Sequence, residues 1–246
     1  MHDKPLRVGL WSPLPPPLGG IGRWSLRYLE AAPRVGLQVE PINTSPRPGS
    51  FTERSAFRLD RLRPAARSLS QLIRLLATRQ LDVVHLATTL FWATPRDGAA
   101  LAQCRAAGVP TVLHIRASNQ IVAWRESLSP MRRWALDAVL RQASRVLVLS
   151  EELEDYLQHA LPGLRLARLG NMVELPERPH APVLPPRTRP RVLFVGAITP
   201  LKGLTELADA VFGLPDVELV LVGGACIKAA QPSAKSGIPG DGPPPL

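Results

Sequence analysis

The chain has 246 residues, a hydrophobic content of 45% and a formal net charge of +10. This length suits one large domain or two smaller ones, and the hydrophobic content is ordinary for a globular protein. No apolar run is long enough to cross a bilayer, and the N-terminal residues lack an apolar signal core, so we expect a cytoplasmic protein.

Most of the positive charge comes from arginine, because lysine occurs only at Lys4, Lys202, Lys228 and Lys235. Two interpretations remain open. Together with abundant proline and alanine, the bias is typical of a GC-rich coding sequence. It is equally consistent with attraction to an anion such as a nucleotide diphosphate, a lipid headgroup surface or a nucleic acid.

Short apolar runs alternate with helix-like stretches over the first 160 residues. The runs, rich in Val, Ile and Leu, are Arg7–Trp11, Leu37–Ile42, Asp82–Leu86, Thr111–Ile115 and Arg145–Leu149. The helix-like stretches cover residues 22–32, 64–79, 97–107, 130–142 and 151–160. Strands that are apolar on both faces and alternate with helices predict an α/β fold, a doubly wound parallel sheet. Such sheets bind ligands beyond the carboxyl ends of their strands.

Four regions follow from the changes in composition. Residues 1–176 form the first domain, and residues 177–190, ERPHAPVLPPRTRP, are a linker because proline removes backbone donors and stiffens the chain. Residues 191–224 carry a strand–helix–strand pattern that begins a second domain. Residues 225–246, dense in Pro, Gly and Ser, are expected to be disordered. A module of two strands and one helix buries little surface and should be weakly folded alone.

A glycine cluster, PPPLGGIGRW, follows the first predicted strand and places Gly19, Gly20 and Gly22 at the start of a helix. Glycine lets the backbone approach a bulky anion, and the free N–H groups of a helix start favour phosphate. The alternative is a plain tight turn.

Three further side chains are candidates by position. His85 and His114 end predicted strands near the carboxyl edge of the sheet, where each is either a structural residue or a catalyst. Lys202 begins the helix that follows the strand at 191, beside Gly203. There an ammonium group adds to the positive helix end and can hold a diphosphate, whereas the alternative is a solvated lysine.

Other site types have no signature in the sequence. It contains no paired-carboxylate spacing, no D-x-D metal motif, no phosphate loop of the G-x-x-x-x-G-K-[ST] type, no Cys/His cluster and no nucleophile elbow. We therefore expect no metal and no cofactor. Specific nucleic-acid binding is not expected either, because aromatic platforms for single strands are lacking. Residues 54–79 form a basic amphipathic stretch, which either rests on an anionic membrane or packs its leucines on the sheet.

Four segments resemble the family-four glycosyltransferases of GT-B fold, over residues 6 to about 224. They are LFVGAITPLKGLTELADAVFGLPDVELVLVGG at 193–224, SRVLVLSEEL at 144–153, LGNMVELP at 169–176 and RVGLWSPLPPPLGGIGRW at 7–24. The resemblance implies two Rossmann-like domains with a cleft between them, an acceptor-side domain first and a donor-binding domain second. It also implies metal-independent, retaining transfer of a sugar from a nucleotide-diphosphate sugar to a hydroxyl of a glycan or lipid-linked acceptor.

The same resemblance assigns roles by position. Gly19 and Gly20 would line the diphosphate, and Gly196 would belong to the donor-binding loop. His114 would be the catalytic-site residue that contacts the donor sugar near the reacting carbon. Lys202 would stabilise the leaving diphosphate, since a fixed positive charge aimed at a developing anion lowers the barrier.

Two departures from the family pattern qualify this prediction. Ala197 stands where the family usually has arginine, and no acidic E-x7-E motif follows Gly224. We therefore expect a truncated donor domain, for which a frame change after Gly224 is one explanation, and weak or absent transfer by this chain alone. The alternative function is non-catalytic: a remnant that binds a partner or an acceptor.

Overall fold

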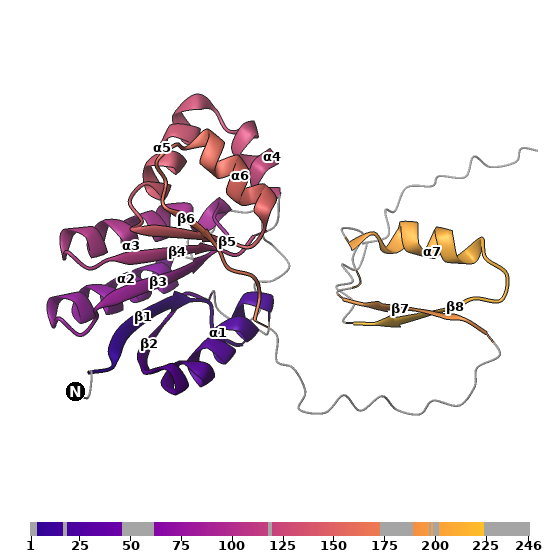
Figure 1. Cartoon of the computed structure of the whole chain (residues 1–246), viewed down its shortest axis with the longest axis horizontal. Coiled ribbons are helices and arrows are strands. Elements are labelled where there is room, and N and C mark those ends of the chain that lie inside the picture. The colour runs from indigo at the N-terminus through magenta and orange to yellow at the C-terminus, as the bar shows by residue number, and fades with distance from the viewer. Residues whose placement is uncertain are drawn as a thin grey trace, which may run out of the picture. The chain divides into compact units, whose positions relative to one another are not determined.

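The computed structural model describes residues 4–16, 19–45, 62–117, 120–172, 189–196, 198 and 202–223. The chain divides into two compact units, residues 1–176 and 177–246, and each is described by itself (Figure 1). Most of the predicted linker and the whole of the predicted tail lie outside the described residues.

The first unit contains a six-stranded parallel sheet with the strand order β2-β1-β3-β4-β5-β6. The strands are β1 (Leu6–Ser12), β2 (Leu37–Asn43), β3 (Val83–Thr88), β4 (Thr111–Ile115), β5 (Arg145–Val148) and β6 (Leu166–Arg168). The helices are α1 (Gly20–Ala31), η1 (Ala32–Val35), α2 (Leu62–Ala77), η3 (Phe91–Ala93), α3 (Thr94–Ala106), α4 (Gln120–Ser127), α5 (Pro130–Leu140) and α6 (Glu151–Ala160). The predicted Rossmann-like α/β fold is confirmed.

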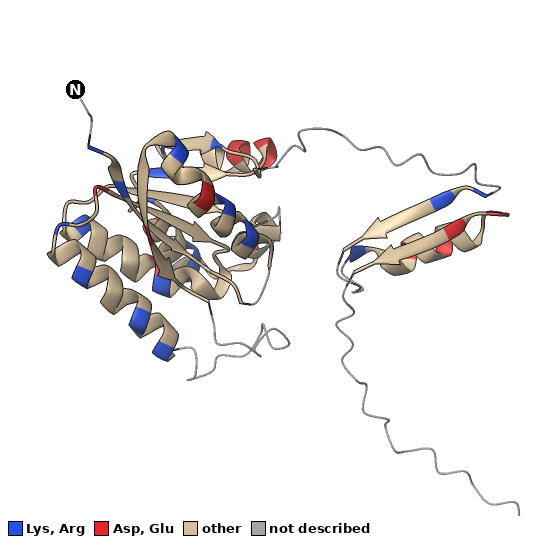
Figure 2. Ribbon diagram, turned by 90° about the horizontal axis from the view of Figure 1, so that it is seen from below, with Lys and Arg blue, Asp and Glu red and all other residues tan. Residues whose placement is uncertain are grey.

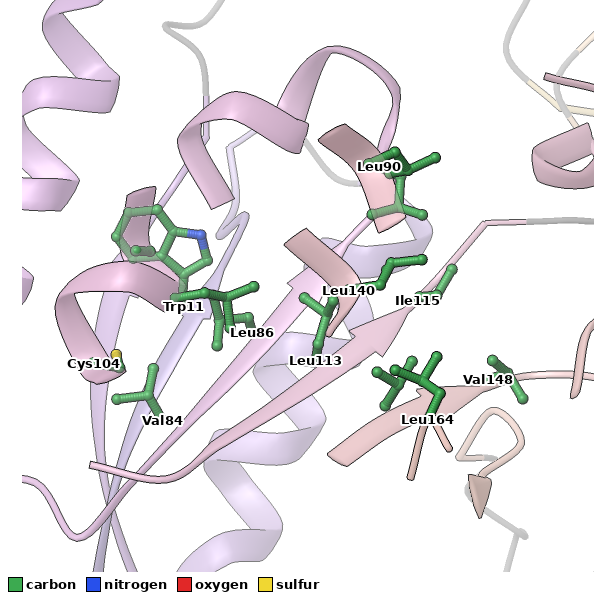
Figure 3. Packing of buried hydrophobic residues seen from close by; sticks show 14 of the residues in the cluster. Trp11, Val84, Leu86, Leu90, Cys104, Leu113, Ile115, Leu140, Val148 and Leu164 are labelled. Atoms are coloured by element: carbon green, nitrogen blue, oxygen red, sulfur yellow. The ribbon is translucent and has the colours of Figure 1, made fainter. Parts of the chain in front are cut away.

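The larger hydrophobic core lies on one face of this sheet (Figure 3). Alternate strand residues point to this face because side chains in a strand alternate between the two sides. Trp11 of β1, Leu86 of β3 and Leu113 of β4 are fully buried here. They pack with leucines from the covering helices α2, α3, α5 and α6, namely Leu72, Leu101, Leu140 and Leu153.

The opposite face carries a smaller core beneath α1. Leu10 of β1 and Ala87 of β3 are buried there with Trp24 of α1. Strand register places both candidate histidines on this face, since His85 pairs with Leu10 and His114 pairs with Ala87. The polar residues of interest therefore share a face with α1 rather than with the larger core.

Helix α2 packs its leucines inward. Leu72, Leu75 and Leu76 are buried in the larger core, whereas Arg67 and Arg74 are exposed. Figure 2 shows the Lys and Arg positions along the ribbon in blue. The apolar stripe of residues 62–77 is thus used by the fold. Residues 54–61 of the predicted amphipathic stretch lie outside the described part of the chain. No helix among the described residues has the length and apolar character needed to cross a membrane.

The second unit contains β7 (Arg191–Val195), α7 (Leu204–Phe212) and β8 (Glu218–Val222), and its two strands pair in parallel. Alternate residues of β7 differ in exposure: Phe194 is half-buried, whereas Leu193 and Val195 are 59% and 70% exposed. One face of this small sheet therefore presents apolar side chains to solvent.

Candidate functional site

The topology of the first unit marks one position at the edge of the sheet. Strand β1 pairs with β2 on one side and with β3 on the other, so the chain order reverses at β1. In open α/β sheets, ligands bind beyond the carboxyl ends of the strands at such a switch point. Helix α1, which begins at Gly20 after β1, starts at this edge.

Gly19 and Gly20 lie at the start of α1. Gly19 is the N-cap, its backbone is extended, and no side chain caps the helix. The first amide groups of any helix lack acceptors within it, so they are free to bind an anion. A Cβ atom added at either glycine would meet no atom within 4 Å. Open space therefore lies beside this backbone, and the diphosphate-lining role of both glycines stays a prediction.

Four aromatic rings from α1, β3 and β4 pack together beside this helix start. The rings of His85 and His114 stack with centroids 5.5 Å apart, and Trp24 meets each of them edge-on at 5.4 Å. Tyr28, one turn after Trp24, meets His85 edge-on at 5.3 Å. We call these four residues, together with Arg116, the α1-face cluster.

Both histidines of the cluster are neutral at pH 7. Burial, followed by the charges of Arg116 and of His85, lowers the pKa of His114 to about 3, against a smaller opposing effect of the Leu169 backbone. Burial, followed by the Arg116 charge, lowers the pKa of His85 to about 4. A neutral imidazole offers one N–H donor and one acceptor nitrogen.

Two ring nitrogens in the cluster are buried without a hydrogen-bond partner among the described residues: Nε2 of His85 and Nδ1 of His114. The other nitrogen of His85 lies 3.4 Å from the Tyr28 hydroxyl. A buried polar atom that lacks a partner costs about 1–3 kcal/mol. Such atoms are sites where a ligand or a water molecule would add a favourable contact.

Arg116 follows directly after β4 and closes the cluster from the strand end. Its Cζ atom lies 4.3 Å from the centroid of the Trp24 ring. Its Nη2 donates to Oδ1 of Asn171 at 2.5 Å, and its Nη1 lies 3.5 Å from Nε2 of His114. Burial lowers the pKa of Arg116 to about 10, so the guanidinium keeps its charge at neutral pH.

The two histidines predicted for the strand ends occupy different positions along their strands. His114 is the fourth residue of β4 and lies near its carboxyl end, as expected, but it is fully buried behind Trp24 and Arg116. His85 is only the third residue of β3, because that strand continues to Thr88. The expectation that His85 lies at the carboxyl edge is therefore wrong, and it meets the site through its stacking with His114.

Sequence reasoning did not single out three members of the cluster, Trp24, Tyr28 and Arg116, or Asn171, which contacts Arg116. Arg116 carried a usable signal, because a residue two positions after His114 lies on the same side of an extended chain. Trp24 follows the glycine cluster by one helical turn, which also places it near the helix start. No pattern in the sequence indicates that Asn171 contacts Arg116.

Two predicted donor-binding residues lie in the second unit. Lys202 is exposed, forms no salt bridge with a described residue, and precedes Gly203, the N-cap of α7. Gly203 has a φ of 69°, a left-handed conformation that favours glycine. Gly196 N–H donates to the Val222 carbonyl at 2.9 Å, and a Cβ on Gly223 would come within 1.7 Å of the Gly196 oxygen. The backbones after β7 and β8 are therefore in close contact.

No group of three or more His, Cys, Asp or Glu side chains within the described ranges is placed to hold a metal ion. The binding roles of Gly196 and Lys202 stay predictions, and Ala197 lies outside the described residues.

Comparison with known protein families identifies a match to one family model. The sequence model described as Glycosyltransferase Family 4 matches residues 18–177, which is well over half of the chain. No curated protein matches the chain. The matched segment contains the glycines at the start of α1, the whole α1-face cluster and strands β2 to β6. The chain therefore belongs to glycosyltransferase family 4.

Proposed function

We propose that this chain acts in the transfer of a sugar, with retention, from a nucleotide-diphosphate sugar to a hydroxyl of a glycan or lipid-linked acceptor. The observation that carries the proposal is the family match over a unit whose topological switch point bears free helix amides and the α1-face cluster. These are groups suited to a phosphorylated sugar, because they offer positive charge and hydrogen-bond donors.

The proposed roles follow from the chemistry of each group. The amides beyond Gly19 and Gly20 bind the diphosphate. His114, neutral and fully buried, donates or accepts a hydrogen bond at the sugar. Lys202 supplies the positive charge that stabilises the departing diphosphate, and Gly196 allows close approach of its loop.

Isothermal titration calorimetry with UDP, GDP and their sugars tests this proposal on the whole chain. We expect saturable binding of one nucleotide, with K202M weakening it at least about tenfold, since a charge-assisted bond is lost. Lys4, exposed in the first unit, provides the matched control K4M, which should bind as the wild type does. Turnover of the bound donor should be slow. Absence of affinity for every nucleotide would contradict the proposal.

A second candidate function is binding of a protein partner or an acceptor without catalysis. The exposed apolar side chains of β7, Leu193 and Val195, favour it, because apolar surface of this kind marks contact sites. The same calorimetry separates the candidates, since a pure partner-binding protein has no nucleotide affinity.

We also propose that the chain works in the cytoplasm at the inner face of a membrane, held there by charge alone. Leu72, Leu75 and Leu76 of α2 are buried, so they are not available for insertion into a membrane, and the outward face of the helix carries exposed arginines. Each basic residue near an anionic surface contributes about 1 kcal/mol. Such contact is weak and is lost at high salt.

A further inference from the structure

Arg116 is half-buried, and it differs from three other half-buried or buried arginines in having no counter-charge among the described residues. Arg7, Arg96 and Arg125 each place a guanidinium nitrogen 2.6–2.8 Å from a carboxylate, supplied by Asp82, Asp97 and Asp137 respectively. Arg116 forms no salt bridge with any described residue, and burial alone accounts for its lowered pKa. A desolvated cation without an anion is costly in free energy.

The described residues that contact Arg116 are all neutral. One face of the guanidinium lies against the Trp24 ring, Nη2 donates to the Asn171 amide, and Nη1 faces the neutral imidazole of His114. These contacts fix the orientation of the fork without cancelling its charge. A positive group held rigidly among neutral partners is arranged to receive an anion.

Hydrogen-bond donors without a partner among the described residues support the same conclusion. Nε of Arg116 is buried and has no partner among the described residues, and neither has Nδ1 of the fully buried His114 beside it. A guanidinium has five N–H donors in a planar fork whose geometry matches the oxygens of a phosphate or carboxylate. Among the described residues, its one well-formed bond goes to Asn171, and most of its donors have no partner there.

We propose that Arg116 is the anchor for a phosphate-type oxyanion of the substrate at the carboxyl end of β4. Trp24 and Asn171 are positioning residues that hold the guanidinium, and His114 contacts it through Nε2. The proposal rests on the proposed function insofar as the anion is part of a sugar-transfer substrate. Two sources share this chemistry: the diphosphate of the donor, and a phosphate group carried by the acceptor.

Titration of the whole chain with inorganic phosphate at low ionic strength tests the proposal directly. We expect R116Q to weaken phosphate binding about tenfold or more, because charge-assisted hydrogen bonds are lost. R116K, which keeps the charge but not the fork, should fall between R116Q and the wild type. Arg105, exposed at the end of α3, provides the control R105Q, which removes the same charge elsewhere and should leave the affinity unchanged.

A second variant, N171A, tests the proposal independently if R116Q does not fold. Asn171 is exposed, so N171A removes the orienting bond without leaving a buried hole, and it should weaken phosphate binding about threefold to tenfold. Equal phosphate affinity in R105Q, N171A and a folded R116Q would overturn the proposal, as would failure of the wild type to bind phosphate.

Addition of UDP distinguishes the two sources of the anion. Competition between UDP and phosphate assigns Arg116 to the donor diphosphate, whereas independent binding assigns it to an acceptor phosphate. The two proposals also fail separately. Nucleotide binding without phosphate binding contradicts the role of Arg116 alone, and phosphate binding without any nucleotide affinity contradicts sugar transfer alone.

Discussion

Substitution of Asp97 should destabilise the first unit more than any exposed change. Its fully buried carboxylate accepts a hydrogen bond from Trp11 Nε1 at 2.9 Å and from the Thr88 hydroxyl at 2.5 Å. It also pairs with Arg96 at 2.8 Å. One side chain thus joins β1, β3 and α3 at the edge that carries the candidate site.

The magnitude follows from these three contacts. Loss of one partner of a buried ion pair costs about 3–5 kcal/mol, because the other charge is left without compensation. The buried Trp11 N–H would also lose its acceptor, and contributions within one network do not add. We therefore expect D97A to lower the free energy of unfolding by about 3–5 kcal/mol. D97N keeps one acceptor oxygen and should cost about 1–3 kcal/mol.

Urea unfolding followed by tryptophan fluorescence measures this effect. The five tryptophans lie at positions 11, 24, 92, 124 and 134, so the signal reports the first unit alone. The control is D155A at an exposed position of α6, which should change stability by less than about 0.5 kcal/mol. A D97A protein within about 1 kcal/mol of the wild type would refute the reasoning from buried pairing.

Three other predictions address different parts of the chain. The pKa values of His85 and His114 are about 4 and 3 in the folded protein, whereas an unperturbed histidine has a pKa of 6.5, so the unfolded chain binds more protons between pH 6.5 and 4. The free energy of unfolding should therefore fall as the pH falls through this window, and H114N should show a shallower slope in urea titrations; a flat wild-type profile from pH 7 to 5 would argue against buried neutral histidines. G223A should disrupt β7–β8 pairing, because the added Cβ would lie 1.7 Å from the Gly196 oxygen, whereas G213A, with its nearest atom at 3.7 Å, should not. Hydrogen exchange of the amides of residues 191–223 measures the loss of pairing. Equal protection in G223A and G213A would contradict the expected disruption. In flotation with anionic liposomes, the whole chain should bind at low salt and the triple charge reversal of the arginines at 63, 67 and 74 should weaken binding; no binding by the wild type at low salt would end the membrane proposal.

Much of the fold was predictable because the strands of a parallel sheet are continuous apolar runs. The runs at 7–11, 37–42 and 111–115 match β1, β2 and β4 to within one residue at each end. Strand β6 was missed because Leu166–Arg168 is only three residues long and has no apolar run. Short elements of this kind are defined by their neighbours rather than by their own sequence.

Helix α4 was missed for a related reason. It has eight residues, and its two buried positions are Ile121 and Arg125. A charged side chain occupies the place where an apolar residue would reveal the helical period. That arginine is tolerated because Asp137 of α5 accepts two hydrogen bonds from its guanidinium, at 2.7 and 2.9 Å. Sequence spacing alone does not show such a tertiary pair.

The candidate site was predictable in part. The glycine cluster stood out because it follows a strand, and His114 stood out because it lies near the carboxyl end of one, where this class of sheet binds ligands. Arg116 did not stand out among many arginines, since the absence of a carboxylate partner is a property of the folded chain. Trp24 was seen only as part of a motif, although in the fold it contacts both histidines and Arg116.

We propose that the start of α1 and the carboxyl end of β4 bind a phosphorylated sugar substrate. Titration of the isotope-labelled chain with UDP and GDP, followed by NMR, tests it most directly. We expect saturable shifts of the Gly19 and Gly20 amide signals for one nucleotide, and a shift of the Arg116 Nε–H signal as well if this side chain anchors the donor diphosphate. Unchanged signals at all three positions, with both nucleotides at millimolar concentration, would contradict it.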